Sequence, residues 1–375
     1  MKKILLFLTS FLPLAAAAQL NGDGYYRIQN NASERYLTLK DNVINDEIDM
    51  STASADVSNL RSWRGFDQVE ANPASLFYVM NVGGHQYNLI AQSTSIYDIT
   101  GGRKYLDIYD MASGSYYLFE VTSSGGMAGR IYDSNDSAVR GSITTKGEKA
   151  YCYWRLLPVT TDANYIGLKP TVEAADGWYG TIYASFPFKL NSSNVTVYYV
   201  DGVSAGQFQL KQIESEVIPA ATPLIFKTNS KDPAQNKIIP LFVATTAPTD
   251  NQLSGTYYSS RNRNHEAYVE FNASTMRVLG VDADKNLIFT ADATGALTDK
   301  NDIPMNTCWL KVPDGLSGDF KFVDRSSFTA IRSIETSPKE TINKGTYTLS
   351  GVRVDNSKTL RPGVYIQDGK KIVIK

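Results

Sequence analysis

Short segments that alternate aromatic or β-branched residues with polar ones recur along the chain, and Gly, Asn or Asp bound each segment. Alternation of this kind buries one face of a strand, and the bounding residues supply turns. The 375 residues include 23 Tyr, 15 Phe and 27 Gly, a composition that favours pleated surfaces joined by turns. Because no long segment follows a helical period, the sequence predicts an all-β fold. The clearest predicted strands are 26–28, 36–39, 76–80, 87–91, 105–109 and 116–121.

The N-terminal residues follow the order of a secretory signal peptide. Basic Lys2 and Lys3 precede an apolar stretch over 4–14, and small residues end at Ala18. A membrane anchor is the alternative, but polar residues interrupt the stretch, which is shorter than the roughly 20 residues that span a bilayer. We therefore expect residues 1–18 to be removed by cleavage between Ala18 and Gln19. The mature protein is expected to be extracellular or on the cell surface.

Length, charge and cysteine content limit the classes of protein that the chain can represent. The remaining residues predict two or three domains, and no later segment is apolar enough to span a membrane. A net charge of −1, from 37 basic and 38 acidic residues, gives no electrostatic case for a nucleic-acid partner. Two cysteines, Cys152 and Cys308, make no disulfide framework; two buried thiols are favoured, although a pairing between them stays open.

The first part of the chain contains a weak internal repeat. Aromatic residues stand at the centre of three similar segments, at Phe77, Phe119 and Trp154. Their spacing is a period of roughly 40 residues, which is typical of a threefold array of four-stranded units.

Residues 22–159 resemble the ricin-type, lectin-like β-trefoil modules of secreted bacterial proteins. The resemblance is carried by 24–30 (GYYRIQN), by 35–37 (RYL) and by 153–159 (YWRLLPV). The family's repeat ends in Gln-x-Trp; here Trp154 keeps the tryptophan, and the glutamine is absent from all three repeats. The resemblance implies a β-trefoil domain over 19–160.

The same resemblance implies a carbohydrate-binding site in one of the repeats. A sugar packs its C–H face on an aromatic ring, while carboxylate and carboxamide groups bind its hydroxyl groups. In trefoil lectins the site lies between an early Asp and a later aromatic, Asn or Gln. The candidate ligand-binding residues are Asp107, Tyr109 and Asp110 in the second repeat, and Asp133 and Asn135 in the third. The alternative is that these side chains only build the strands.

About ten candidate strands follow, which predicts a central β-sandwich over 165–325. A turn at 219–223 leads into a buried strand at 224–226. Together with 277–281 and 308–313, these residues are similar to a β-sandwich module of surface proteins from Bacteroidetes.

A polar linker is expected over 326–344, and three short strands with glycine turns over 345–375. The last segment combines Leu349-Ser350-Gly351, Pro362-Gly363 and Gly369-Lys370-Lys371 in order. It resembles the C-terminal sorting domain of the type IX secretion system, which implies outer-membrane secretion machinery as a partner. An ordinary small β appendage is the alternative. Ser137, within Asp136-Ser137-Ala138, resembles an acceptor for protein O-glycosylation in Bacteroidetes.

Motifs that would mark catalysis or metal binding are missing from the sequence. His85 and His265 do not stand at metal-ligand spacing, and no Gly-x-Ser-x-Gly turn marks a nucleophile. The segment 282–286 begins like a calcium loop, but Leu287 stands where that loop needs glycine, so a β-turn is favoured. We therefore predict no metal, no cofactor and no enzyme activity.

These observations favour a secreted or cell-surface binding protein that takes glycans through its N-terminal domain. The alternative is a structural or adhesive surface protein without a small-molecule site.

Overall fold

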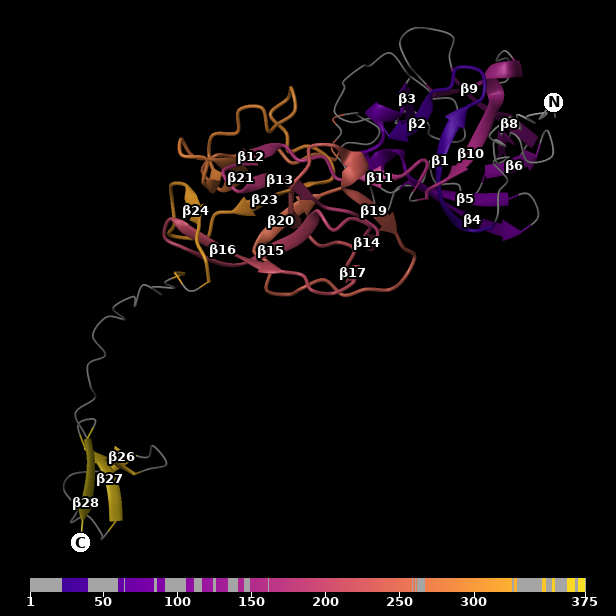
Figure 1. The fold of residues 1–375 in the computed structure, drawn as a ribbon. Helices are drawn as coiled ribbons and strands as arrows, with labels where there is room; N and C mark the ends of the chain where they lie inside the picture. The colour runs from indigo at the N-terminus through magenta and orange to yellow at the C-terminus, as the bar shows by residue number, and fades with distance from the viewer. Residues whose placement is uncertain are drawn as a thin grey trace, which may run out of the picture. The chain divides into compact units, whose positions relative to one another are not determined.

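The computed structural model is all-β, which confirms the predicted fold class: the described residues form 28 strands and four short 3-10 helices (Figure 1). Contacts divide the chain into two compact units, one ending at Phe328 and one beginning at Thr329. Among the described residues no helix is long and apolar enough to cross a membrane. The structure describes residues 22–39, 60–63, 65–83, 86–91, 106–110, 117–123, 126–133, 141–144, 149–160, 162–257, 259, 261, 267–325, 327–328, 346–348, 353–354, 363–367 and 370–374.

The first ten strands form one sheet in the N-terminal part of the chain. The strands are β1 (Gly24–Asn30), β2 (Tyr36–Leu39), β3 (Leu60–Trp63), β4 (Phe77–Gly83), β5 (Gln86–Ala91), β6 (Leu106–Asp110), β7 (Tyr117–Ser123), β8 (Gly126–Asp133), β9 (Gly141–Thr144) and β10 (Tyr153–Pro158). The short helices are η1 (Phe66–Gln68), η2 (Pro73–Ser75) and η3 (Lys149–Cys152). Strand β3 and the helical turn η1 follow each other closely along the chain.

Strand pairing in this sheet repeats three times. Strands β1, β5 and β8 each pair with the strand that follows them, in β1·β2, β5·β6 and β8·β9. Strands β4, β7 and β10 each pair with the first strand of the next repeat, in β4·β5, β7·β8 and β10·β1. Because β10 pairs with both β1 and β7, strands β1, β4, β5, β6, β7 and β10 form a closed circuit, called the ring below.

Large side chains from β1, β4 and β10 fill the core of the ring. Ile28, Phe77, Trp154 and Leu156 are fully buried. Along β10, Trp154 and Leu156 alternate with half-buried neighbours, as a strand with one covered face requires. Each such side chain contributes about 1.5 to 3 kcal/mol when it is removed from water. Phe77 and Trp154 are thus the core residues of the first and third repeats, as the aromatic period indicates.

The central part of the chain contains two further sheets. The smaller has the order β11-β19-β14-β17, and the larger has the order β12-β13-β18-β15-β16-β24-β22-β21-β23-β20. Their elements are β11 (Ile166–Gly167), β12 (Val172–Ala174), β13 (Gly177–Ile182), β14 (Phe188–Leu190), β15 (Val195–Ser204), β16 (Gln207–Gln212), β17 (Val217–Ile218), β18 (Leu224–Thr228), β19 (Lys237–Pro240), β20 (Leu253–Thr256), β21 (Met276–Val281), β22 (Leu287–Thr290), β23 (Thr307–Lys311), β24 (Phe320–Phe322) and the helix η4 (Pro233–Gln235).

Two hydrophobic cores lie on opposite faces of β13, β15 and β18. Val197 of β15 packs with Phe188 of the smaller sheet in the first core. Val200 of the same strand packs with Phe289 of β22 in the second. Strand β24 pairs in parallel with β16 and antiparallel with β22, so the larger sheet continues into β22, β21, β23 and β20. These strands supply the other side of the second core. Within the described residues the central part also has a third, smaller cluster, formed by Val278, Ile303 and Trp309. The β-sandwich expected over 165–325 stays a prediction.

Both cysteines are buried thiols. Burial raises the pKa of the Cys308 thiol above its usual range. Its Sγ donates to the carbonyl oxygen of Leu224. These observations agree with two buried thiols rather than one disulfide, and a buried thiol of raised pKa is a poor nucleophile.

The ring and the central sheets belong to the same unit and share direct contacts. The hydroxyl of Tyr25 donates to the carbonyl oxygen of Leu241 at 2.7 Å. The ring of Tyr78 stacks on Phe242 with centroids 4.1 Å apart. Arg27 of β1 donates to the carbonyl oxygen of Tyr165 at 2.6 Å. Polar and aromatic contacts thus join the N-terminal ring to the rest of this unit.

The second unit is a sheet of four strands with the order β26-β25-β27-β28. The strands are β25 (Thr346–Thr348), β26 (Arg353–Val354), β27 (Gly363–Gln367) and β28 (Lys370–Ile374). The sequence predicts three strands here; the structure has a fourth, β26, which pairs antiparallel with β25. The linker expected over 326–344 lies almost wholly outside the described residues.

Candidate functional site

Three of the predicted ligand-binding residues lie on one strand of the ring. Asp107, Tyr109 and Asp110 all belong to β6, in the second repeat. In the backbone register Asp107 lies between Gln86 of β5 and Glu120 of β7. Their side chains are outside the described part of the structure, so the structure fixes their strand and register alone.

The other predicted residues are more scattered. Asp133 is the last residue of β8 and pairs with Gly141 of β9, two strands away from β6 in the sheet. Asn135, the acceptor Ser137 and the cleavage residues Ala18 and Gln19 lie outside the described residues. The structure therefore brings three of the five ligand-binding candidates together and places a fourth on a separate repeat.

The described side chains line a cleft of about 990 Å³ in the central part of the unit. Its lining comes from the segment 166–173, from β21 and β22, and from the loop between β22 and β23, with 71–73 of the N-terminal part. Apolar side chains such as Val278 and Ile288 alternate with the hydroxyl groups of Thr181, Thr290 and Thr294. The cleft also carries the carboxylates of Glu173, Asp282, Asp292 and Asp319 and the ammonium of Lys169.

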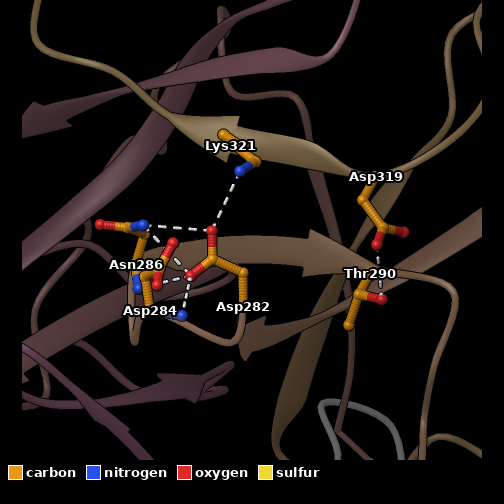
Figure 2. A network of polar contacts seen from close by, with 6 residues as sticks. All are labelled: Asp282, Asp284, Asn286, Thr290, Asp319 and Lys321. Atoms are coloured by element: carbon orange, nitrogen blue, oxygen red, sulfur yellow. Dashed lines mark hydrogen bonds and ion pairs between the residues drawn. The ribbon is translucent and has the colours of Figure 1, made fainter.

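A polar network borders this cleft where β21 turns into β22. Figure 2 shows Asp282 between Asn286 and Lys321, with Asp319 and Thr290 forming a separate pair. The carboxylate of Asp282 accepts from the backbone nitrogen of Asn286 at 2.9 Å and forms an ion pair with Lys321 at 3.0 Å. The hydroxyl of Thr290 donates to Asp319 at 3.1 Å.

Hydrogen bonds lower the pKa of two carboxylates of the cleft, Asp282 and Asp292. Those from the Asn286 side chain and backbone, together with Lys321, lower the pKa of Asp282 to about 2. The hydroxyl and backbone nitrogen of Thr294 lower the pKa of Asp292. Because these carboxylates already bind turns of the protein, they act as structural acceptors rather than as acids for a reaction.

The segment 282–286 is a turn that its first residue holds in place. Asp282 accepts from the backbone nitrogen of Asp284 at 3.0 Å, and the backbone nitrogen of Asp282 donates to the carbonyl oxygen of Asn286 at 3.0 Å. The backbone nitrogen of Lys285 donates to the carbonyl oxygen of Asp282 at 3.0 Å, which is the hydrogen bond that closes a β-turn. This geometry confirms the β-turn interpretation. Within the described residues no three His, Cys, Asp or Glu side chains gather as metal ligands, and His85 and His265 lie outside that part.

The sequence alone did not reveal the cleft. Asp292 comes after β22 and Asp319 comes directly before β24, and their only local signal is that Asp is common in turns. Thr290 and Asp319 are 29 positions apart along the chain. They meet because β22 and β24 pair antiparallel.

Comparisons with known proteins return no family model and no curated protein that matches. Among solved structures, the designed threefold symmetric protein ThreeFoil is 13% identical with a TM-score of 0.25, over 36% of this chain and 100% of that chain. A Polyporus squamosus lectin, bound to a human-type influenza-binding epitope, is 13% identical with a TM-score of 0.24, over 37% of this chain and 50% of the lectin. A mosquitocidal holotoxin is 10% identical with a TM-score of 0.26, over 78% of this chain and 34% of the toxin. These TM-scores are too low to carry an argument.

Proposed function

We propose that the chain is an exported, non-catalytic glycan-binding protein. In this proposal its N-terminal domain, residues 19–160, is a ricin-like β-trefoil. The threefold strand pairing of the ring carries this proposal. A β-trefoil consists of three four-stranded repeats around a barrel, and the pairings β4·β5, β7·β8 and β10·β1 join three successive repeats into one circuit. The spacing of Phe77, Phe119 and Trp154 in the sequence supports the same layout.

The glycan site of this proposal lies in the second repeat, on β6. Asp107, Tyr109 and Asp110 follow one another along that strand, so an aromatic ring and two carboxylates occur within four positions. An aromatic face takes the C–H face of a sugar, and carboxylates accept from its hydroxyl groups. Asp133 and Asn135, in the third repeat, would form a second site of the same chemistry.

Binding rather than catalysis is supported by the carboxylates in the described part of the chain. Those with shifted pKa values, including Asp176, Asp250 and Asp282, are shifted downward and stay ionised at neutral pH. A glycosidase needs one carboxylic acid of raised pKa to protonate the leaving oxygen. Ionised carboxylates suit hydrogen bonds to hydroxyl groups instead.

The proposed site of action is the cell surface or the medium outside it. The signal-peptide pattern over 1–18 supports export. The motifs over 345–375 are the basis for the proposed recognition by outer-membrane secretion machinery of the type IX kind. The described residues of this segment form strands β25 to β28 of one sheet.

A structural or adhesive role is the second candidate, and one observation favours it. Phe242 and Val243 follow β19 with 65% and 53% of their surfaces exposed, although large apolar side chains seldom stay in water at neighbouring positions. Such a pair would suit contact with another protein surface.

A glycan array, probed with the full chain lacking residues 1–18, tests the proposed function. We expect binding to a defined set of glycans, and we expect Asp107→Ala to weaken it at least about tenfold, since a buried charged hydrogen bond contributes on the order of 1.5 to 3 kcal/mol. Asp162→Ala is the matched control, because this exposed Asp lies outside the ring strands. An array on which the wild-type chain binds nothing would reject the glycan function and leave the adhesive one.

A further inference from the structure

A stacked aromatic pair joins the ring to the central sheets, and one of its two side chains is open to solvent. The ring of Phe242, in the loop after β19, stacks on that of Tyr78, of β4, with centroids 4.1 Å apart and planes 9° from parallel. Tyr78 is buried, whereas Phe242 has 65% of its surface exposed. Because Tyr78 covers one face of the Phe242 ring, solvent reaches the opposite face. This stacked pair is called the aromatic platform below.

Contacts on both sides of the stack hold the aromatic platform in place. The ring of Tyr25 packs edge-on against Tyr78 with centroids 5.0 Å apart. The hydroxyl of Tyr25 donates to the carbonyl oxygen of Leu241 at 2.7 Å, and the backbone nitrogen of Leu241 donates to the carbonyl oxygen of Pro187 at 2.8 Å. Both backbone groups of the residue before Phe242 are therefore fixed. An aromatic ring that is held in advance of its ligand loses little conformational freedom on binding.

The open apolar surface at this place is small. Phe242 and Val243 are two of the three large apolar side chains that are exposed among the described residues. Since a buried aromatic side chain covers about 150 to 250 Å², the two together leave on the order of 200 Å² open. A stable protein interface takes about 800 Å² from each partner. In size the aromatic platform therefore suits one ring of a small ligand better than a folded protein.

The chemistry around the platform favours a sugar as that ligand. The face of an aromatic ring carries partial negative charge, so it attracts the weakly positive C–H groups on the apolar face of a sugar. Asp23 is exposed and lies near enough to Tyr78 for its charge, after the larger effect of burial, to raise the pKa of the Tyr78 hydroxyl. The Asp23 carboxylate accepts from the backbone nitrogen of Asn81 at 2.8 Å, which orients it. A carboxylate beside a flat aromatic face matches the hydroxyl groups at the edge of a sugar ring.

We propose that the aromatic platform binds one sugar ring of a glycan chain, which stacks its C–H face on the open face of Phe242. The proposal takes its ligand class from the proposed glycan-binding function, but it places the contact on the loop after β19. It gives the chain a glycan contact that does not depend on Asp107 of β6.

The test is a calorimetric titration of the full chain lacking residues 1–18 with cellotetraose, maltotetraose, mannotetraose and N-acetylchitotetraose. We expect at least one tetrasaccharide to bind. Phe242→Leu should weaken that binding about tenfold, because leucine is apolar but offers no flat face for stacking. Phe242→Trp keeps a flat aromatic face and should hold the affinity within about twofold or raise it.

Val243→Ala is the matched control, because Val243 is the next residue along the chain and is also exposed, but has no ring. We expect this variant to change the affinity by less than about twofold. An affinity that Phe242→Leu leaves unchanged overturns the proposal, and so does a wild-type chain that binds none of the four tetrasaccharides.

Two further measurements separate sugar binding from other roles of the exposed ring. Because Phe242 lies mostly in water, Phe242→Leu without sugar should keep its Tm within about 4 °C of the wild type, while it loses the sugar-induced rise in Tm that the wild type shows. Analytical ultracentrifugation tests contact with a second copy of the chain. Self-association that Phe242→Asp abolishes, in a chain that binds no tetrasaccharide, would assign the exposed ring to that contact and reject the sugar site.

Asp107→Ala in the same titrations separates the aromatic platform from the site on β6. Binding that only Asp107→Ala weakens leaves the proposed trefoil site in place and rejects the platform. Binding that only Phe242→Leu weakens supports the platform and rejects the site on β6. If no tetrasaccharide binds the wild-type chain, the platform is rejected, while the glycan array still decides the trefoil function.

Discussion

At the scale of single residues, Arg27 shows how a buried charge can join two segments of the chain. Its side chain is fully buried. It donates to the carbonyl oxygens of Asn164 at 3.0 Å and Tyr165 at 2.6 Å, and to the hydroxyl of Ser75. Burial lowers its pKa to about 9, which still leaves the guanidinium charged at neutral pH. The charge is therefore stabilised by neutral oxygens of Ser75, before β4, and of Asn164 and Tyr165, after β10.

Replacing this guanidinium should destabilise the unit strongly. We expect Arg27→Met to lower the free energy of unfolding by about 3 kcal/mol, because it leaves buried carbonyl and hydroxyl oxygens without donors. Urea denaturation followed by circular dichroism measures the loss. Arg155→Met is the control, since Arg155 is half-buried and donates to Asn31 at 2.9 Å, and its loss should cost under about 1 kcal/mol. Equal losses in the two variants would contradict the role given to Arg27.

At the scale of elements, the hairpin of β21 and β22 depends on one carboxylate in its turn. Hydrogen bonds from Asn286 and the ion pair with Lys321 favour the ionised form of Asp282 in the folded state. Its pKa is about 2 when folded, against an ordinary value of 3.8. A carboxylate whose pKa is lowered by folding stabilises the fold above its ordinary pKa, and that stabilisation disappears as the pH falls through the folded value.

Acid unfolding of the wild-type chain should show this dependence, and a variant without the Asp282 carboxylate should lack it. We expect the Tm of the wild-type chain to fall between pH 4 and pH 2 more steeply than the Tm of Asp282→Asn, in which this titration is absent. Scanning calorimetry at several pH values in that window measures both slopes. Asp284→Asn is the control, because this exposed neighbour in the same turn contributes only its backbone nitrogen to the network. Parallel slopes for the wild type and Asp282→Asn would show that the carboxylate does not act in this way.

The sequence predicts strands well where the signal is local. The expected strand over 36–39 matches β2, and those over 87–91 and 105–109 match β5 and β6 within one residue at either end. Alternation of apolar and polar residues sets these strands, and it is readable within a few positions. Pairings between distant strands, such as the parallel pair of β16 and β24, leave no such local signal, because register and partner depend on the packing of both cores.

The candidate sites divide in the same way. Asp107, Tyr109 and Asp110 could be named because they lie together in the sequence and resemble a family pattern. The cleft of about 990 Å³ could not, since its lining comes from segments between residues 71 and 319 that only the fold brings together.

At the scale of the whole molecule, strand β24 marks where the first unit ends. Phe320 is fully buried in the second core, and β24 connects β16 to β22 in the larger sheet. Beyond it, the backbone nitrogens of Ser327 and Phe328 donate to the carbonyl oxygen of Asp324 in a last turn. The contacts that define the first unit end at Phe328, and those of the second begin at Thr329.

Two truncations on either side of this turn should therefore behave differently. A chain that ends at Phe328 keeps every strand of the first unit, so we expect its main unfolding transition to stay within about 2 °C of that of the full chain. A chain that ends at Asp319, only nine residues shorter in the same unit, loses β24 and with it the connection between two halves of a sheet and a core phenylalanine. Removal of a buried Phe alone costs about 3 to 5 kcal/mol, so this chain should lose cooperative unfolding or fail to fold. Calorimetry of both chains decides the matter: a large fall in Tm for the longer truncation product would mean that residues after Phe328 stabilise the first unit, and a cooperative transition in the shorter one would mean that the larger sheet does not depend on β24.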